Sequence, residues 1–274
     1  MFKSKMEDYW DMNTIKVSII TVSYNAVDTI EQTILSVLNQ SYRNVEYIII
    51  DGQSTDGTQE VIEKYKDKLA YYVSEPDGGI FDAMNKGIKQ ASGDVIGIIN
   101  SDDWYELDAV ANIVPCFESG DAEIVYGKSR HIYLDGSVSY SENMPLSELW
   151  MHMSVSHPSC FVKREVYQRK GLFDTKYRIA GDYEFMLGCY SSGVKFKYID
   201  KVIANFRYGG ISTTDTVAAA RETLQVAKTY MDKCFDCDRE TLLKLWEQKD
   251  LEVRLREMFL YYPQILENHL TQAF

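Results

Sequence analysis

The sequence predicts an α/β fold, in which a mixed and mainly parallel sheet is flanked by helices and followed by a helical C-terminal tail. Over residues 16–100, four short runs rich in β-branched residues alternate with segments whose apolar residues have helical spacing. Polar turn residues follow each run, and beyond Thr216 almost all residues favour helix. Strands that alternate with helices are typical of parallel sheets, because a helix is the usual crossover between parallel neighbours.

The first two strands and their helices are expected between residues 16 and 68. "KVSIITVSY" (16–24) and "VEYIII" (45–50) are short β-branched runs bounded by turn residues, as in the buried strands of parallel sheets. "DTIEQTILSVLNQ" (28–40) places its apolar residues at helical spacing behind Asp28, a favourable N-cap residue. A second helical segment, "TQEVIEKYKDK" (58–68), follows the turn-rich "DGQSTDGT".

Two more strands complete this half of the chain, and polar residues gather at the strand ends. "LAYYVSE" (69–75) and "DVIGIIN" (94–100) are predicted strands, separated by the helix "IFDAMNKGIKQA" (80–91). In open α/β sheets, ligands bind beyond the carboxyl ends of the strands. A binding site is therefore expected where the following residues lie: Tyr24, Asp51, Asp77, Asp102 and Asp103.

The pattern changes after residue 121. Alternating segments on either side of the Asp135–Gly136 turn predict a hairpin. A strand running into a helix, a loop running into a helix, and one or two further strands are expected over residues 157–212. The simplest partition is one domain with two halves, 16–120 and 121–215, between a polar leader (1–15) and a helical extension (216–274).

Composition excludes several classes of protein. Among 274 residues, 45% are hydrophobic and 26% are charged, as in an ordinary globular protein. The formal net charge of −12, without a basic patch, argues against a nucleic-acid partner. No stretch approaches the roughly 20 apolar residues of a membrane span. Five scattered cysteines and no signal peptide predict a cytoplasmic setting.

Several motifs occur in order between residues 16 and 210: "VSIITVSYN", "YIIIDGQSTDGT", "GIFDAMNKGI", "GDVIGIINSDDW" and "GDYEF". Together they resemble the family 2 glycosyltransferases, and most closely the bacterial members that build polysaccharides. The resemblance implies the GT-A fold of nucleotide-diphospho-sugar transferases. It also implies that residues 16–120 are the nucleotide-sugar-binding half and residues 121–215 the acceptor-binding half.

The adjacent carboxylates of Asp102 and Asp103 are candidates to hold a divalent cation. In transfer from a sugar nucleotide, negative charge grows on the departing diphosphate, and a cation stabilises that charge. Mn²⁺ and Mg²⁺ prefer oxygen ligands, and Mg²⁺ often takes only one or two protein carboxylates. Adjacent residues point in different directions, so one is expected to bind the metal and the other the ribose or a metal-bound water. The resemblance implies that Asp103 is the direct ligand; the alternative is that one Asp only caps the next helix.

Two residues are candidates to bind the nucleotide base. The resemblance implies that Asp51 accepts a hydrogen bond from the imide N–H of uracil, which favours a UDP-sugar as donor. Tyr24 is placed to stack on or flank the base. The family usually has a second acidic residue in this turn, whereas this chain has Gly52 and Gln53. Loop capping by Asp51 and a core position for Tyr24 are the structural alternatives.

Two residues of "EPDGGIFDAMNKG" are further candidates for donor binding. Asp77 precedes Gly78 and Gly79, where the backbone is expected to turn sharply or to approach a ligand closely. Asp77 is a candidate to contact the ribose or uracil, and Asn85 to contact the phosphates or the sugar. Ordinary turn and helix-surface chemistry are the alternatives.

Asp182 in "AGDYEF" is the candidate general base. An inverting transfer needs one carboxylate that takes the proton of the acceptor hydroxyl, and no nucleophile from the enzyme. The resemblance places Asp182 at the base position, although many relatives have Glu where this chain has Gly181. Glu184 is the competing carboxylate, and capping of the following helix is the structural alternative to catalysis.

Two residues of the second half complete the candidate site. His157 in "SHPSCF" is placed to line the acceptor or sugar pocket, and Arg207 in "FRYGGIS" to approach the diphosphate. A structural histidine and a surface arginine are the alternatives. Gly209 and Gly210 predict a flexible loop that closes over the donor.

These residues predict a metal-dependent inverting glycosyltransferase that moves a sugar, most simply from a UDP-sugar, to a saccharide or lipid-linked saccharide in cell-surface polysaccharide synthesis. A nucleotidyltransferase would need a glycine-rich basic loop, which "TVSYNAVDTIEQ" lacks. A non-catalytic sugar-nucleotide-binding protein is the other alternative. The tail leaves open packing on the domain, pairing with another copy, or peripheral contact with the inner face of the cytoplasmic membrane.

Overall fold

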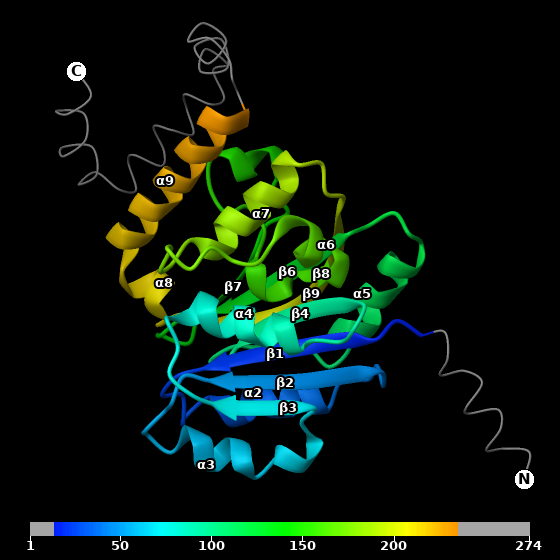
Figure 1. Cartoon of the computed structure of the whole chain (residues 1–274), viewed down its shortest axis with the longest axis vertical. Coiled ribbons are helices and arrows are strands. Elements are labelled where there is room, and N and C mark those ends of the chain that lie inside the picture. The colour runs from blue at the N-terminus through cyan, green and yellow to red at the C-terminus, as the bar shows by residue number, and fades with distance from the viewer. Residues whose placement is uncertain (1–13, 235–274) are drawn as a thin grey trace, which may run out of the picture.

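The computed structural model describes residues 14–234 of the chain (Figure 1). Most of the predicted leader at 1–15 and the part of the predicted tail beyond residue 234 lie outside the described residues. One curled sheet runs through the described part, and helices cover both of its faces. No helix between residues 14 and 234 combines the length and the apolar character needed to cross a bilayer.

Within residues 14–234 the strands join into one nine-stranded sheet. Its order is β3-β2-β1-β4-β8-β6-β9-β5, and β7 pairs with β6 beside this path. The strands are β1 (Val17–Ser23), β2 (Val45–Asp51), β3 (Tyr71–Ser74), β4 (Val95–Asn100), β5 (Trp104–Tyr105), β6 (Ile124–Ile132), β7 (Val138–Tyr140), β8 (Phe161–Lys163) and β9 (Phe196–Arg207).

The four strands predicted over residues 16–100 form the parallel part of the sheet. β1 pairs in parallel with both β2 and β4, so that Val17 lies opposite Val45 on one side and Val95 on the other. β3 extends this part in parallel beyond β2. Every residue of β1 is buried, because helices cover both faces here. The uninterrupted β-branched runs that predicted these strands follow from that double coverage.

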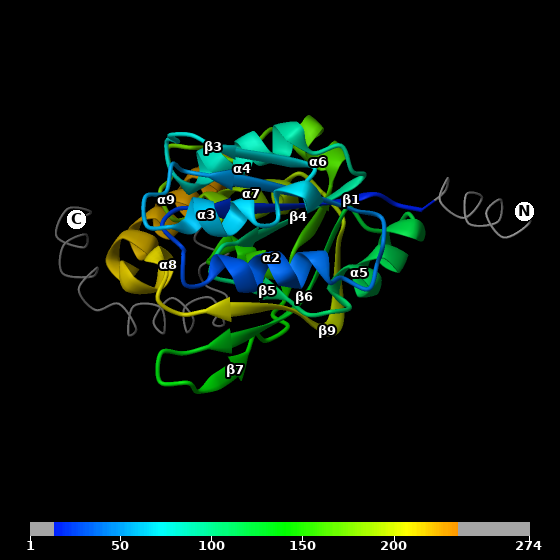
Figure 2. The same ribbon diagram turned by 90° about the horizontal axis from the view of Figure 1, so that it is seen from below.

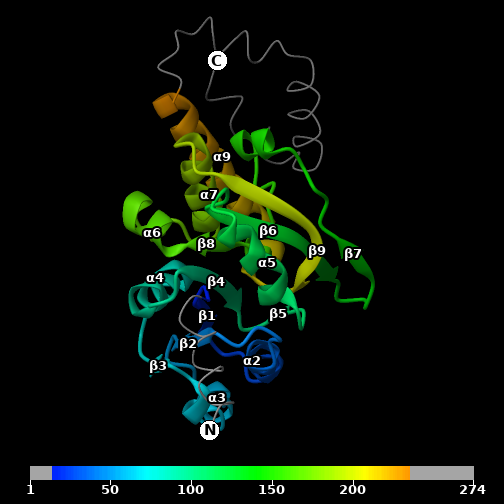
Figure 3. The same ribbon diagram turned by 90° about the vertical axis from the view of Figure 1, so that its right-hand side faces the viewer.

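Helices lie on both faces of the sheet, as predicted, and Figure 3 shows α2 and α4 on opposite sides of β1 and β4. Alternation along β1 puts Ile19 in the core beneath α2, α3 and α5, and Ile20 in the core beneath α4, α6 and α7. The helices are α2 (Ile30–Leu38), α3 (Thr58–Glu63), α4 (Ile80–Gln90), α5 (Ala109–Glu118), α6 (Arg164–Lys170), α7 (Gly181–Ser191), α8 (Ile211–Thr214) and α9 (Thr216–Cys234), with short 3₁₀ turns η2 (Lys66–Lys68), η3 (Leu146–Trp150) and η4 (His157–Ser159).

The second half adds antiparallel pairings, which give the sheet its mixed character. β8 pairs antiparallel with both β4 and β6, and so joins the two halves. The predicted hairpin is confirmed: β6 and β7 pair antiparallel around Asp135 and Gly136, and the hairpin projects beyond the sheet (Figure 2). β9 is one long strand, parallel to β6, with an irregularity near Lys128.

The first helix begins one residue later than its predicted cap. Thr29, not Asp28, occupies the N-cap position of α2, and no side chain caps this helix end. The backbone N–H groups of Thr29 and Ile30 donate instead to the carbonyl of Ala26. A backbone turn therefore satisfies the groups that an Asp28 side chain was expected to bind.

Glu46 on β2 is expected to contribute to stability at neutral pH. Burial alone would raise the pKa of Glu46, but hydrogen bonds from Lys16, Ser18 and Ser92 outweigh burial and lower that pKa to about 2. We expect Glu46→Gln to reduce the free energy of unfolding at pH 7 by about 1–3 kcal/mol, the usual range for hydrogen bonds to a charged group. Urea unfolding curves measure this difference.

The pH dependence of that difference has a defined sign. A depressed carboxyl pKa stabilises the fold above the ordinary value of 4.5, and the stabilisation disappears as the pH falls toward about 2. The stability gap between wild type and Glu46→Gln is therefore expected to close over this window. Glu63→Gln, at an exposed ion pair with Lys66, is the matched control and is expected to change stability by less than about 1 kcal/mol. Equal effects of the two substitutions would contradict the role of Glu46.

Candidate active site

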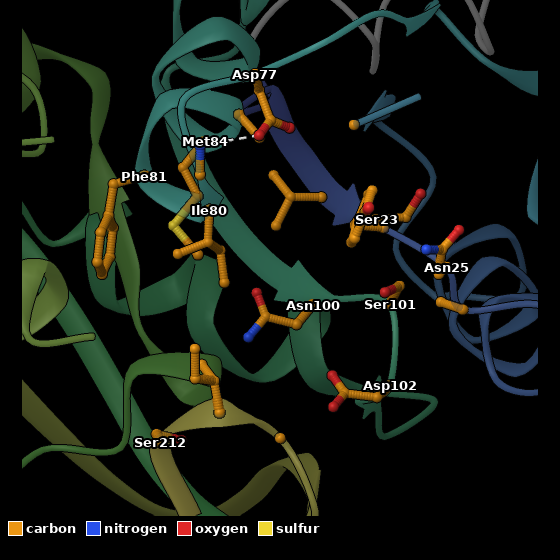
Figure 4. Close-up of a pocket in the computed structure, with 18 of the residues that line it drawn as sticks. Ser23, Asn25, Asp77, Ile80, Phe81, Met84, Asn100, Ser101, Asp102 and Ser212 are labelled. Carbon is orange, nitrogen blue, oxygen red and sulfur yellow. Dashed lines mark hydrogen bonds between the residues drawn. The ribbon is translucent and has the colours of Figure 1, made fainter. Parts of the chain in front are cut away.

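A cavity of about 920 Å³ opens at the carboxyl ends of β1 to β4. Its other wall comes from the second half: η4, the loop before α7, the end of β9, and α8. Figure 4 shows Asp77, Asn100 and Asp102 around the open space, with Ile80 and Met84 of α4 forming an apolar side. The predicted edge of the sheet thus carries a cavity at the junction of the two halves.

The structure brings part of the predicted set of residues together at this cavity. Those that line it are Tyr24, Asp77, Asp102, His157 and Asp182. Four other predicted residues do not belong to the lining, namely Asp51, Asn85, Asp103 and Arg207. Each of these four has partners inside the protein that explain its position.

Asp51 fastens the ends of three strands. Its side chain is fully buried. Oδ1 accepts hydrogen bonds from the hydroxyls of Ser23 and Ser54, and Oδ2 accepts from the Ser54 backbone N–H and the Ser74 hydroxyl. These four bonds occupy the carboxylate, as the loop-capping alternative predicts, and a contact of Asp51 with the nucleotide base stays a prediction.

Asn85 bonds to the backbone of Phe173, and its contact with phosphate or sugar stays a prediction. Its side-chain amide donates to the carbonyl of Phe173 at 2.9 Å and accepts from the N–H of Phe173 at 3.0 Å. The pair ties α4 to the segment between α6 and α7. Because the side chain is buried and doubly bonded, it points away from the cavity that α4 lines with Ile80 and Met84.

The two adjacent aspartates differ in their exposure to the cavity. Asp102 lines the cavity, whereas Asp103 is 1% exposed and accepts a hydrogen bond from the Arg207 N–H at 2.9 Å. Burial raises the pKa of Asp102, against the opposing charge of Arg207. Burial, with the neighbouring charge of Asp102, raises the pKa of Asp103 further. Of the two, Asp102 therefore faces the cavity in this structure, and the choice of Asp103 as the direct metal ligand stays a prediction.

Arg207 lies beside the cavity without lining it. Its guanidinium donates to Gln32 at 2.8 Å and stacks over the Trp104 ring at 5.1 Å. The side chain is thereby held against α2 and β5, while its charge still acts on Asp102. Of the two glycines that follow, Gly210 lines the cavity, and a Cβ at Gly210 would lie 3.4 Å from Asp102 Oδ2.

Asp182 and His157 lie together on the wall of the cavity that the second half of the chain forms. Both line the cavity and both are half-buried. Burial raises the pKa of Asp182, against the influence of His157, and burial lowers the pKa of His157. The competing carboxylate Glu184 points elsewhere, since it accepts a hydrogen bond from Tyr230 of α9. The second half therefore places one carboxylate on its wall of the cavity, Asp182, and the first half places two, Asp77 and Asp102.

Gly52 lets Asp77 approach Tyr24. A Cβ at position 52 would lie 2.6 Å from Asp77 Oδ2 and 3.3 Å from Tyr24 Cδ2. Asp77 Oδ1 accepts from the Gly79 N–H at 2.9 Å, and Tyr24 is 68% exposed at the rim. The carboxylate of Asp77 therefore lies over Gly52, in the turn after β2.

Some residues that line the cavity were not predicted from the sequence. Asn25 and Gln53 both line the cavity with positive φ, 48° and 62°, conformations that non-glycine residues rarely adopt. Asn25 tolerates this because its backbone N–H donates to Ser54 and its side-chain oxygen accepts from the Thr55 N–H. Arg178 also lines the cavity. Their positions in the sequence could have indicated the site, because Asn25 and Gln53 follow strand ends and Arg178 precedes "AGDYEF".

A second cavity of about 260 Å³ adjoins the first through shared residues. His157, Ile179, Asp182 and Phe206 line both cavities. The remaining lining is largely apolar and includes residues of α9. Asp182 therefore stands where two binding spaces meet.

The end of β4 fits a divalent cation. Asp102 presents a carboxylate to the large cavity, and the buried atoms Asn100 Oδ1 and Asp103 Oδ2, from the same segment of chain, have no hydrogen-bond partner. These are the oxygen ligands that Mg²⁺ and Mn²⁺ prefer. Between residues 14 and 234 no group of three or more His, Cys, Asp or Glu gathers. A cation here would therefore complete its coordination with phosphate oxygens and water.

Comparisons with known proteins agree with this arrangement. The model of glycosyl transferase family 2 matches residues 18–201. An uncharacterized glycosyltransferase of Mycobacterium tuberculosis is 36% identical over 180 residues, which are 62% of this chain and 67% of that protein. A PGL/p-HBAD biosynthesis glycosyltransferase of Mycobacterium bovis is 26% identical over 204 residues, 72% of this chain and 79% of that protein.

Solved structures share the fold. The S. aureus TarS fragment 1–349 in complex with UDP-GlcNAc has a TM-score of 0.67 at 18% identity, over 82% of this chain and 68% of that one. The mannosyltransferase PcManGT from Pyrobaculum calidifontis, solved with GDP-Man and Mn²⁺, has a TM-score of 0.59 at 17% identity, over 96% and 90% of the two chains. These similarities confirm the predicted GT-A fold.

Proposed function

This chain belongs to the family 2 glycosyltransferases, and we propose that it is an inverting enzyme that transfers a sugar from a UDP-sugar to a saccharide or lipid-linked saccharide acceptor. The observation that carries this proposal is the pair of carboxylates, Asp102 from the first half and Asp182 from the second, that line the same cavity. Asp102 is placed to hold a cation at the departing diphosphate, and Asp182 is placed to take the proton of the acceptor hydroxyl.

The donor nucleotide binds in the large cavity beside Tyr24. The exposed ring flanks the base, and Asp77 Oδ2 next to it accepts a hydrogen bond from the base or the ribose. Uracil and guanine present an N–H that a carboxylate binds, whereas cytosine presents an acceptor at the corresponding position. The TarS fragment was solved with UDP-GlcNAc and the mannosyltransferase with GDP-Man. A comparison of UDP-, GDP- and CDP-sugars therefore measures which nucleotide base this chain selects.

The leaving diphosphate lies against the end of β4. Asp102, with oxygen atoms of Asn100 or Asp103, would hold Mn²⁺ or Mg²⁺, which when bound supplies positive charge to the departing phosphates. Arg178 faces the same cavity with a permanent positive charge and is placed to act on the same anion. Ile80 and Met84 form an apolar side, which limits access of water to the donor.

The acceptor enters through the second cavity, with Asp182 at the junction. Asp182 takes the proton of the acceptor hydroxyl as its oxygen forms a bond to the anomeric carbon. The bond from that carbon to the diphosphate breaks, and the electron pair leaves with the phosphate oxygen. His157 lies beside the general base Asp182 and stays neutral, because burial lowers the pKa of His157. It orients the acceptor by hydrogen bonding.

Binding and turnover of sugar nucleotides test the proposal. We expect the melting temperature of the full-length chain with Mn²⁺ to rise with a UDP-sugar, and less with GDP-mannose or CDP-glucose. A ligand at about 100 times its dissociation constant stabilises by about 2.7 kcal/mol. UDP-glucose, UDP-galactose and UDP-GlcNAc are compared, with and without EDTA, followed by assays of UDP release with oligosaccharide acceptors.

Each outcome of this experiment has a separate meaning. A shift that EDTA removes, followed by UDP release, supports the metal-dependent transferase. A shift without release, across an acceptor panel that includes lipid-linked saccharides, favours a non-catalytic binding protein. No shift with any sugar nucleotide contradicts the proposal. The cytoplasmic location, the peripheral membrane contact and self-association expected from the sequence stay predictions.

A further inference from the structure

The loop that leads into α7 is held by a glutamate of the C-terminal helix. Glu222 of α9 accepts hydrogen bonds from three successive backbone N–H groups: Oε1 from Arg178 at 3.0 Å, and Oε2 from Ile179 and Ala180, both at 2.8 Å. Successive N–H groups that point at one anion form a concave anion site. The carboxylate of Glu222 fills it, and hydrogen bonds to an ionised acceptor are stronger than those between neutral groups.

This loop places two side chains that matter for the proposed chemistry. Arg178 begins it and lines the large cavity. Ala180 ends it as the N-cap residue of α7, so Asp182 follows in the first turn of that helix. The Asp182 side chain accepts a hydrogen bond from the N–H of its neighbour Tyr183. Within the described residues, its position therefore depends mainly on the backbone that carries it.

The helix that supplies Glu222 is docked on the domain at several points. α9 lies alongside α7 (Figure 1), and Val226 is fully buried between them. Tyr230 donates to Glu184 of α7 at 2.6 Å. Ala219 and Thr223, which flank Glu222 on α9, line the second cavity. This helix begins beyond residue 201, where the match to the family model ends.

We propose that Glu222 is a positioning residue, which fixes the loop 178–180 and thereby sets the places of Arg178 and Asp182 in the active site. The catalytic part of this inference rests on the function proposed above. The contact makes α9 part of the active-site architecture, because a change in how α9 packs would move the base and the cation together.

Glu222 also acts on Asp182 through its charge. The titratable groups that act on the Asp182 carboxyl are His157 of η4, Cys160 before β8 and Glu222 of α9. Burial is the main cause that raises the Asp182 pKa, His157 opposes it, and the negative charge of Glu222 adds a smaller increase. Removal of this charge is therefore expected to move the acid limb of the activity profile to lower pH. A role of Glu222 in packing alone predicts no such shift.

Three substitutions separate position from charge. Glu222→Ala removes all three bonds, Glu222→Gln keeps the shape but loses the charge, and Glu222→Asp keeps the charge on a shorter side chain. The matched control is Glu184→Gln. This substitution weakens the hydrogen bond from Tyr230 of α9 to α7 and leaves the bonds from the loop to Glu222 intact. Each full-length variant is compared by hydrogen–deuterium exchange of the peptide that contains residues 178–180, and by steady-state kinetics with the best UDP-sugar.

We expect faster amide exchange in this peptide for Glu222→Ala, and less change for Glu222→Gln. We expect kcat to fall at least about tenfold in Glu222→Ala, since a misplacement of about 1 Å can cost 10²-fold in rate. The acid limb moves to lower pH in Glu222→Ala and Glu222→Gln but not in Glu222→Asp. Glu184→Gln is expected to match wild type in all these measurements.

Two results would overturn the inference. Unchanged exchange at residues 178–180 in Glu222→Ala shows that the loop does not depend on Glu222. Faster exchange with unchanged kcat and an unchanged acid limb shows that the loop does not position the base. If the wild-type chain releases no nucleotide from any sugar nucleotide, the proposed function fails, while the exchange data still decide whether Glu222 holds the loop.

Discussion

Substitution of Asp182 by asparagine is expected to lower kcat by about 10²- to 10⁴-fold, the usual contribution of a positioned general base. Asparagine keeps the size of the side chain and can still accept from the Tyr183 N–H, but it cannot take a proton from the acceptor hydroxyl. The melting-temperature rise that a UDP-sugar causes should be unchanged, since the donor binds mainly to the opposite wall. Single-turnover assays with saturating donor and acceptor measure the chemical step directly.

The pH dependence of the wild-type enzyme provides a second readout of the same base. Asp182 acts in its ionised form, and burial raises its pKa above the ordinary value of 3.8. The protonated, inactive form therefore persists to higher pH than for an exposed aspartate. kcat/KM is expected to fall as the pH drops through this raised pKa, and the residual activity of Asp182→Asn should lack this limb.

Glu184→Gln is the matched control for Asp182→Asn, because Glu184 lies two residues further on the same helix. Its carboxylate accepts from Tyr230 instead of facing the cavity, so its activity should stay within a few-fold of wild type. A loss in Glu184→Gln that equals the loss in Asp182→Asn would reassign the base. Full activity of Asp182→Asn would remove the base from the mechanism altogether.

The parallel part of the fold was predictable because its signal is local. Uninterrupted β-branched runs such as residues 17–23 reflect burial on both faces, and helical spacing between them dictates crossovers. The order of the remaining strands was not predictable in this way. That β8 joins the two halves by antiparallel pairing with β4 and β6 depends on contacts between segments more than 30 residues apart. No periodicity in a short window carries that information.

The location of the site was predictable, but the direction of individual side chains was not. Strand ends placed Tyr24, Asp77 and Asp102 at the cavity, since the carboxyl ends of parallel strands share an edge. The same rule placed Asp51 there, yet three serines from separate segments occupy its carboxylate. Glu222 had no signal in the sequence, because its partners are backbone N–H groups more than 40 residues away.

The aspartate pair yields a second strong prediction, because only Asp102 of the two lines the cavity. Asp102→Asn is expected to lower kcat/KM at least about 100-fold, because stabilisation of the leaving group by a cation is worth several kcal/mol and each 1.36 kcal/mol is tenfold in rate. Asp103→Asn is expected to stay within about tenfold of wild type, because Asp102 and Asn100 still present oxygen atoms to a cation and an amide oxygen still accepts the Arg207 N–H.

The two variants form a matched pair, with the same substitution at adjacent residues of one strand end. kcat/KM is measured across a Mn²⁺ titration, with melting temperatures to verify folding. Asp102→Asn should need more Mn²⁺ for half-maximal activity, whereas the Mn²⁺ dependence of Asp103→Asn should resemble wild type. The reverse ranking would restore Asp103 as the ligand. Asp103 Oδ2 would then be the ligand atom, because Oδ1 already accepts from the Arg207 backbone.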